Sequence, residues 1–168
     1  MTERSRTVTW VDPAEARTAA AGLSGLELMR ALRDGTIPPP PMAVLSSSTL
    51  VEAEPGRVVF TCAPGEEHYN PLGTVHGGLL CTLLDTVVGC AAHTTLDAGV
   101  GYTSIEIKVN YLRAVTLASG TLTATGSVTK PGRRVIFAEG EIRDASGAIV
   151  ATASSSLLVL AAPGSPTA

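Results

Sequence analysis

One apolar segment in the middle of the chain constrains the fold more than any other part of the sequence. After the loop sequence NPLGTVHGG at residues 70–78, apolar side chains recur at the i, i+3, i+4 and i+7 spacing that is typical of a wide apolar stripe on an α-helix. These side chains are Leu79, Leu80, Leu83, Leu84, Val87, Val88, Ala91 and Ala92. The pattern predicts a single long hydrophobic helix that begins near Gly77.

The segments on either side of this helix have the composition of β-strands. Two stretches before it, MAVLSSSTLVEA from Met42 and VVFTCA from Val58, flank an EPGR turn and predict a hairpin. Four stretches after it are separated mostly by tight turns and predict an antiparallel meander. They cover residues 104–112, 120–130, 133–144 and 148–160. The order ββαββββ predicts an α+β fold, in which a curved six-stranded sheet buries the lone helix.

Alternation within one of these strands predicts how it lies in the sheet. In SIEIKVNYL at 104–112, four apolar residues alternate with Glu106, Lys108 and Asn110. The four are Ile105, Ile107, Val109 and Tyr111. We expect this strand to have one dry face and one face turned to water or a ligand.

The first part of the chain is predicted to be an appendage to this domain. Residues 24–33 have an amphipathic pattern behind a possible capping box of Ser24 and Glu27, and the sequence IPPPP at 37–41 predicts a stiff extended spacer. We therefore divide the chain into a helical appendage with its spacer (1–41), the main domain (42–161) and a tail (162–168). The charges of the appendage are balanced, which does not indicate a DNA-reading arm.

Composition excludes several classes of function. The 168 residues are 45% hydrophobic, enough for one well-packed domain, and the net charge of -3 provides no basic field for nucleic acid. Three cysteines form no paired framework, which indicates free thiols in a reducing compartment. Neither a signal peptide nor a membrane span is indicated, so the expected location is the cytoplasm, away from membranes.

Asp85 interrupts the apolar helix. A carboxylate within an apolar helix requires a partner, solvent or a chemical role. It can be a solvated residue on a polar face shared with Thr82 and Thr86, or an acid that acts on a ligand. Gly89, one turn further on, carries no side chain and would leave room for that ligand.

Gly77 and Gly78 stand where the helix is expected to begin. Backbone N–H groups at a helix start have no intrahelical partner and can hold an oxyanion, although HGG can equally be a simple turn and N-cap. Gly77 and Asp85 are eight residues apart, or ~12 Å along one helix, so one carbonyl cannot easily contact both. If both act, two antiparallel helices related by a twofold axis would combine Gly77 of one chain with Asp85 of the other.

The segment NPLGTVHGGLLCTLLD resembles the motif of the hotdog-fold acyl-CoA thioesterases, in the phenylacetate-pathway (PaaI-like) branch that includes one type of hydroxybenzoyl-CoA thioesterase. The resemblance extends from about Met42 to Leu160 and implies the hotdog fold. It implies that Asp85 is the catalytic carboxylate, as general base or nucleophile, and that the Gly77 N–H binds the thioester oxygen. It further implies that Asn70 places the thioester or water, and that a hydroxyl of Thr103 or Ser104 orients the water.

Other polar groups give less specific predictions of function. His68, His76 and His93 do not have the spacing of metal ligands, so no metal is expected, and His76 is expected to order the loop before the helix. Cys81 is more typical of core filling than of a nucleophile. The sequence KPGRR predicts a basic hairpin tip. The tip is either solvated or contacts the phosphates of coenzyme A through Lys130, Arg133 and Arg134. Gly78 and Gly89 are also expected to lie near the substrate.

The leading hypothesis is hydrolysis of an acyl- or aroyl-CoA thioester to the free acid and coenzyme A, which is part of the substrate and not a resident cofactor. The alternatives are a hotdog enoyl-CoA hydratase or dehydratase, and a regulatory module that binds acyl-CoA without turnover. The partners expected are the substrate and further copies of the chain, in a homodimer that pairs into a homotetramer. The sequence does not define the acyl group.

Overall fold

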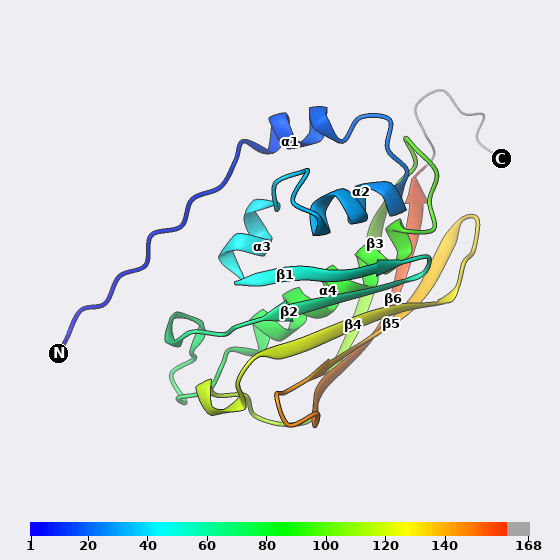
Figure 1. Ribbon diagram of the computed structural model, residues 1–168. Helices are drawn as coiled ribbons and strands as arrows, with labels where there is room; N and C mark the ends of the chain where they lie inside the picture. The colour runs from blue at the N-terminus through cyan, green and yellow to red at the C-terminus, as the bar shows by residue number, and fades with distance from the viewer. Residues whose placement is uncertain (161–168) are drawn as a thin grey trace.

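A single long helix lies against one curved antiparallel sheet in the computed structural model, which describes residues 1–160 (Figure 1). The strands are β1 (Ser48–Glu54), β2 (Arg57–Cys62), β3 (Gly101–Tyr111), β4 (Leu122–Lys130), β5 (Val135–Arg143) and β6 (Ile149–Leu160). The helices are α1 (Pro13–Ala19), α2 (Gly25–Arg33), α3 (Pro41–Leu45) and α4 (Gly77–His93), with two 3₁₀ turns, η1 (Glu66–His68) and η2 (Leu117–Ser119). The predicted ββαββββ hotdog arrangement is confirmed. The tail predicted at 162–168 and the last residue of the predicted domain lie outside the described residues.

The strand order in the sheet is β1-β2-β4-β5-β6-β3. Only β4, β5 and β6 form a meander, and the expectation that β3 would also pair with β4 was wrong. β2 pairs along β4 from Arg57 opposite Ser127 to Cys62 opposite Leu122, so it occupies the edge that β3 would have needed. β3 instead pairs with β6 and forms one border of the sheet.

The core is built around α4. Its side chains Leu83, Leu84 and Val87 are at most 1% exposed and face the sheet. The sheet approaches the helix most closely at Gly126 of β4, where a Cβ atom would lie 2.1 Å from the backbone oxygen of Val87. A glycine at this point lets strand backbone and helix backbone touch.

Strand β3 departs from simple alternation. Ile107 and Val109 pack on the core as predicted, but Ile105 is 55% exposed and Tyr111 is 54% exposed. The pairing with β6 shifts register between Ser104 and Glu106, which makes Ile105 the extra residue of a β-bulge. The predicted dry face is therefore confirmed only for its central part.

The N-terminal elements agree only partly with the sequence prediction. Helix α2 has the predicted capping box, since the Ser24 hydroxyl accepts from the Glu27 N–H and the Glu27 carboxylate accepts from the Ser24 N–H. It begins against the end of α4, where the Gly25 N–H donates to the Leu96 oxygen at 3.0 Å and a Cβ on Gly25 would collide with the His93 carbonyl. Helix α1 was not predicted. No helix within residues 1–160 has the length and apolar character needed to cross a membrane.

The strand predicted to start at Met42 was wrong, because residues 41–45 form α3. Pro40 and Pro41 stand at its N-cap and first helical positions, where a fixed φ favours a helix and a missing N–H costs nothing. Ser46 ends the helix by donating its hydroxyl to the Met42 oxygen at 2.8 Å, and Ser47 has a left-handed φ of 53° before β1 begins.

We predict that Gly126→Ala lowers the free energy of unfolding by ~3 kcal/mol, because the new methyl group would force β4 away from α4. Gly101→Ala is the matched control, since a Cβ there would meet Leu160 at 3.8 Å, an ordinary contact. Urea unfolding of both variants measures the difference. Equal stability of the two variants would contradict the close approach at Gly126.

Candidate active site

His76 caps the start of α4. It is the N-cap residue, and its Nδ1 atom accepts a hydrogen bond from the Gly78 N–H at 2.8 Å. A Cβ atom on Gly78 would lie 2.8 Å from the same nitrogen, so the imidazole can fold back over the helix start only if residue 78 has no side chain. Because Nδ1 accepts this bond, it carries no proton in this arrangement.

Gly77 presents its N–H at the same helix start. The N–H groups of Gly78 and Leu79 both donate to His76, whereas the N–H of Gly77 has no acceptor within residues 1–160. On its other side, Gly77 accepts a bond from the Tyr111 hydroxyl at 3.1 Å, and a Cβ would lie 3.2 Å from the tyrosine ring. Tyr111 was not recognised from the sequence as part of this site, because strand alternation placed it on the dry face.

Asn70 organises the loop before the helix. Its side-chain oxygen accepts from the N–H groups of Leu72 and Thr74, at 2.9 and 3.3 Å, and its side-chain nitrogen donates to the Thr74 hydroxyl at 3.0 Å. The Val75 N–H then anchors this loop by donating to the Val115 oxygen, in the segment between β3 and β4. In this chain Asn70 therefore positions the backbone that leads into Gly77.

Asp85 lies on α4 two turns beyond Gly77, with its side chain exposed. Its Oδ1 atom accepts a hydrogen bond from the Ser104 hydroxyl at 2.8 Å. Of the two hydroxyls that were candidates, Ser104 contacts the acid, while Thr103 makes no hydrogen bond with Asp85. Ser104 is the residue directly before the β-bulge, and bulges commonly re-aim a side chain next to a site.

The space next to Gly89 is filled by an aromatic ring. A Cβ on Gly89 would lie 2.7 Å from the Tyr102 hydroxyl, and the ring of Tyr102 also packs on His93 with 5.4 Å between ring centroids. Burial raises the pKa of Tyr102, with the charges of Cys90 and Asp85 adding to the effect. Gly89 thus makes room for Tyr102 of the same chain.

The candidate site residues of one chain form two separate groups. We call Gly77, His76, Gly78 and Tyr111 the donor half-site, and Asp85 with Ser104 the acid half-site. Eight helical residues separate Gly77 from Asp85, which is ~12 Å along α4. A single thioester carbonyl cannot contact both half-sites of the same chain.

The basic residues Lys130, Arg133 and Arg134 lie at the β4–β5 hairpin tip, and all three are exposed. The backbone of Gly56 connects this hairpin to the far end of α4. Its N–H donates to the hydroxyl of Thr94, which follows the last residue of α4, at 2.7 Å, and its oxygen accepts from the Val128 N–H at 2.8 Å. The basic tip is therefore near the C-terminal end of α4, away from the donor half-site of the same chain.

The cysteines are free thiols, as predicted. Burial raises the pKa of Cys62 to about 11 and that of Cys90 to about 12, with the charge of Asp85 contributing at Cys90, so both remain protonated near neutral pH. His68 fastens its own loop, since its Nδ1 accepts from the Gly65 N–H at 2.9 Å. In the described part of the chain, no three His, Cys, Asp or Glu side chains are grouped as metal ligands would be.

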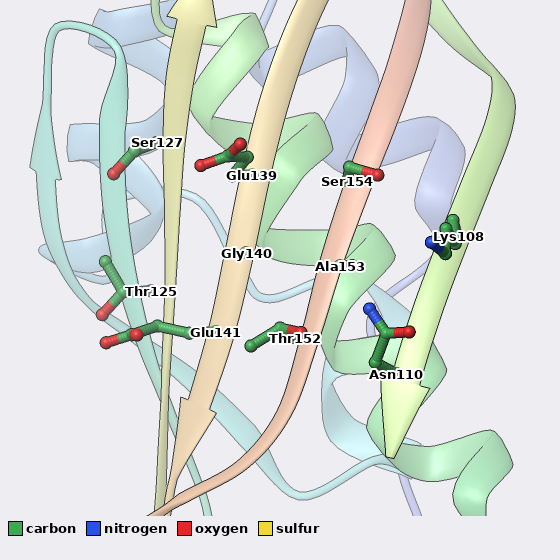
Figure 2. Close-up of a pocket in the computed structure, with 10 residues that line it drawn as sticks. All are labelled: Lys108, Asn110, Thr125, Ser127, Glu139, Gly140, Glu141, Thr152, Ala153 and Ser154. Carbon is green, nitrogen blue, oxygen red and sulfur yellow. The ribbon is translucent and has the colours of Figure 1, made fainter. Parts of the chain in front are cut away.

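A polar depression of about 460 Å³ lies on the outer face of the sheet (Figure 2). Small hydroxyl side chains and the carboxylates of Glu139 and Glu141 line it. These side chains alternate along β4, β5 and β6 with the buried residues that face α4. The depression is therefore on the opposite side of the sheet from Asp85 and takes no part in that site.

Comparison with known proteins identifies the family. Residues 72–151 match the family described as Thioesterase superfamily. The chain is 33% identical to acyl-coenzyme A thioesterase 13 of Homo sapiens over 109 residues, which are 64% of this chain and 76% of the relative. The chain belongs to the thioesterase superfamily.

Solved structures agree with the assignment of this chain to the thioesterase superfamily. A Streptococcus mutans protein bound to acetyl CoA is 26% identical, with a TM-score of 0.62 over 67% of this chain and 88% of that one. The PaaI protein from the phenylacetic acid degradation operon of E. coli is 21% identical and has a TM-score of 0.69 over 89% of this chain and 96% of that one, a likeness of fold. The resemblance predicted from the sequence motif is confirmed.

We predict that His76→Ala lowers the free energy of unfolding by ~1 kcal/mol, because it removes the acceptor for the Gly78 N–H. His76→Asn should retain most of that stability, since asparagine is among the best N-cap residues. Denaturant unfolding of the two variants tests the cap directly. An alanine variant as stable as the asparagine variant would contradict a capping role for this histidine.

Proposed function

We propose that this thioesterase hydrolyses an acyl- or aroyl-CoA thioester to the free acid and coenzyme A. The observation that carries the proposal is the pair of Asp85 and Ser104, a carboxylate with a hydroxyl hydrogen-bonded to it at 2.8 Å on the exposed face of α4. The relative acyl-coenzyme A thioesterase 13 supports the reaction class.

The acid half-site can activate the attacking group in two ways. As a general base, Asp85 accepts a proton from water while the water oxygen bonds to the thioester carbon. As a nucleophile, it forms a mixed anhydride that water then hydrolyses. In both routes the C–S bond breaks, the sulfur leaves as the thiol of coenzyme A, and the bond from Ser104 holds the carboxylate in one orientation.

The donor half-site supplies the complementary function. As the carbonyl oxygen gains negative charge, an N–H group aimed at it lowers the barrier, and removing one such donor typically costs 10²- to 10³-fold in rate. The Gly77 N–H suits this role because it stands at the positive end of α4 and its neighbours at 78 and 79 are already bonded to His76. The Tyr111 hydroxyl holds the Gly77 peptide in position from the other side.

A complete site requires two chains. Two copies of α4, antiparallel about a twofold axis, would bring the donor half-site of one chain to the acid half-site of its partner. Strand β3 supports this pairing, because it forms one border of the sheet and has exposed apolar side chains at Ile105 and Tyr111, followed by exposed Leu112 directly after the strand. Pairing of β3 with a second copy would cover an edge that otherwise invites aggregation.

The same pairing gives the basic hairpin tip a role. The tip of one chain is near the C-terminal end of its own α4, so an antiparallel partner helix would begin nearby. Lys130, Arg133 and Arg134 would then lie close to the partner's donor half-site and contact the phosphates of coenzyme A. The acetyl CoA bound to the Streptococcus mutans protein supports coenzyme A as the carrier group.

We predict that Asp85→Asn reduces thiol release from acyl-CoA substrates at least ~100-fold, because the amide can neither accept the proton nor attack the carbonyl. Asp97→Asn is the matched control, since Asp97 is an exposed carboxylate in the loop after α4. A thiol-reactive dye follows the reaction with a panel of aroyl-, arylacetyl- and straight-chain acyl-CoAs. Native activity that survives in Asp85→Asn would exclude the carboxylate mechanism.

The same panel, with an enoyl-CoA added, separates the alternative functions. A hydratase would consume an enoyl-CoA without releasing thiol, and a regulatory module would bind acyl-CoA and consume nothing. Either result in the native protein would overturn the thioesterase proposal.

We predict that two inactive variants restore activity when mixed. Gly77→Pro removes the N–H of the donor half-site, and the backbone suits proline because the position is the first of the helix and His76 before it has an extended ψ of 133°. The Tyr111 ring, 3.2 Å from a Cβ at this position, must shift slightly to admit it. Random exchange with Asp85→Asn makes half of the dimers mixed, each with one intact site, so activity should reach about a quarter of the native value. Circular dichroism confirms that each variant is folded before mixing. No recovery after proven exchange would show that the site does not combine these residues across chains.

A further inference from the structure

An apolar cavity of about 530 Å³ lies beside α4, between α3 and strand β1. One wall comes from the segment that precedes the sheet and includes Pro39, Pro40 and Val44. Leu50 and Phe60 line it from β1 and β2. Its size falls within the range of ~300–1,000 Å³ that is usual for small-molecule sites.

The cavity borders the acid half-site. Thr86 and Cys90, one turn apart on α4, face into it, and Thr86 directly follows Asp85. Successive helical side chains point ~100° apart, so the cavity lies along the side of the helix next to the carboxylate. A group attached to a carbonyl at Asp85 therefore has this cavity as a neighbouring apolar space.

Two of the four hydroxyl groups that line the cavity, those of Thr86 and Ser48, are already bonded within the protein. The Thr86 hydroxyl donates to the Thr82 oxygen at 2.7 Å, and the Ser48 hydroxyl pairs with that of Ser46 at 2.8 Å. Cys90 holds a thiol whose pKa burial raises to about 12. Apart from the hydroxyls of Ser47 and Thr49, most of the remaining lining is apolar, which suits a hydrocarbon or an unsubstituted aromatic ring better than a hydroxylated group.

The wall from the N-terminal segment is fixed in place before any ligand binds. Ser46 donates to the Met42 oxygen, and its own backbone oxygen accepts from the Cys62 thiol at 3.2 Å. Ser47 has the one positive φ among the non-glycine residues that the structure describes, a strained conformation that tends to occur at functional positions. A wall ordered in advance reduces the entropy cost of binding.

We propose that this cavity holds the acyl group of the thioester, and that the segment 39–50 makes the enzyme prefer unsubstituted apolar acyl groups longer than acetyl. This inference rests on the proposed function. The segment lies outside residues 72–151, which match the family.

The test is a ladder of acetyl-, butyryl-, hexanoyl- and octanoyl-CoA, with phenylacetyl- and 4-hydroxyphenylacetyl-CoA as a second pair. In the native protein kcat/KM should rise about four-fold for each methylene that enters the cavity. The hydroxylated arylacetyl group should be ~10-fold or more poorer than the plain one. Val44→Phe, which fills part of the cavity, should lower kcat/KM for octanoyl-CoA ~100-fold and leave acetyl-CoA within two-fold.

Val51→Phe is the matched control, because Val51 is an exposed valine of β1 outside the cavity lining. It should leave the whole ladder unchanged. A flat ladder in the native protein, or an equal loss on acetyl- and octanoyl-CoA in Val44→Phe, would place the acyl group elsewhere and overturn the inference, while hydrolysis itself would still stand.

Binding to Asp85→Asn tests the cavity without turnover. Calorimetry should show octanoyl-CoA binding at least ~10-fold more tightly than acetyl-CoA, and Val44→Phe added to Asp85→Asn should remove that difference. If the native protein releases no thiol but this binding pattern is present, the proposed function fails and the acyl cavity remains. If the binding difference is absent, or survives the added phenylalanine, the cavity assignment fails.

Discussion

Burial of α4 by a curved sheet is the constraint on which the rest of the structure depends. Five residues of this helix, Leu84 and Val87 among them, have no exposed surface, and at Gly126 the sheet touches the helix backbone. A sheet that curves round a helix still leaves one side of that helix uncovered. On α4 that open side includes Asp85, Thr86 and Cys90, so the same packing that builds the core also presents the acid and the floor of the apolar cavity.

The two half-sites show how a single helix can supply both parts of a reaction without completing it. The N-terminal end offers a backbone donor, while the acid is two turns further along. Their separation is fixed by helical rise and cannot be closed by side-chain motion. In the proposed mechanism, catalysis by this set of groups requires assembly, so the exposed border strand β3 and the chemistry of Asp85 belong to one proposal.

Much of the fold could be predicted from the sequence because its main signals are periodic. The stripe of leucines and valines predicted α4 and its start at Gly77, and the capping box predicted α2. Strand order was less accessible, since the pairing of β3 with β6 depends on β2 occupying the edge of β4. The helix at 41–45 was missed because a proline run is typical of an extended spacer, whereas here its last residue begins a helix.

The candidate site was predictable to a similar extent. Asp85 and Gly77 were proposed from spacing and from the resemblance, but the choice of Ser104 over Thr103 as the hydroxyl bonded to Asp85 depends on a bulge that alternation does not reveal. Tyr111 was missed for a related reason, because it lies at the end of β3 and turns toward a helix start that is distant in sequence. Whether these groups act on a thioester is the subject of the proposed experiments.

The start of α2 has a mechanical consequence for the whole chain. Gly25 donates its N–H to Leu96, and its α-carbon is so close to the His93 carbonyl that no side chain fits between them. The N-terminal segment is thus clamped to the far end of the catalytic helix and does not hang from the domain as a loose extension. Any fluctuation that lifts α2 must also disturb the last turn of α4, so α2 and the core are expected to melt as one cooperative unit.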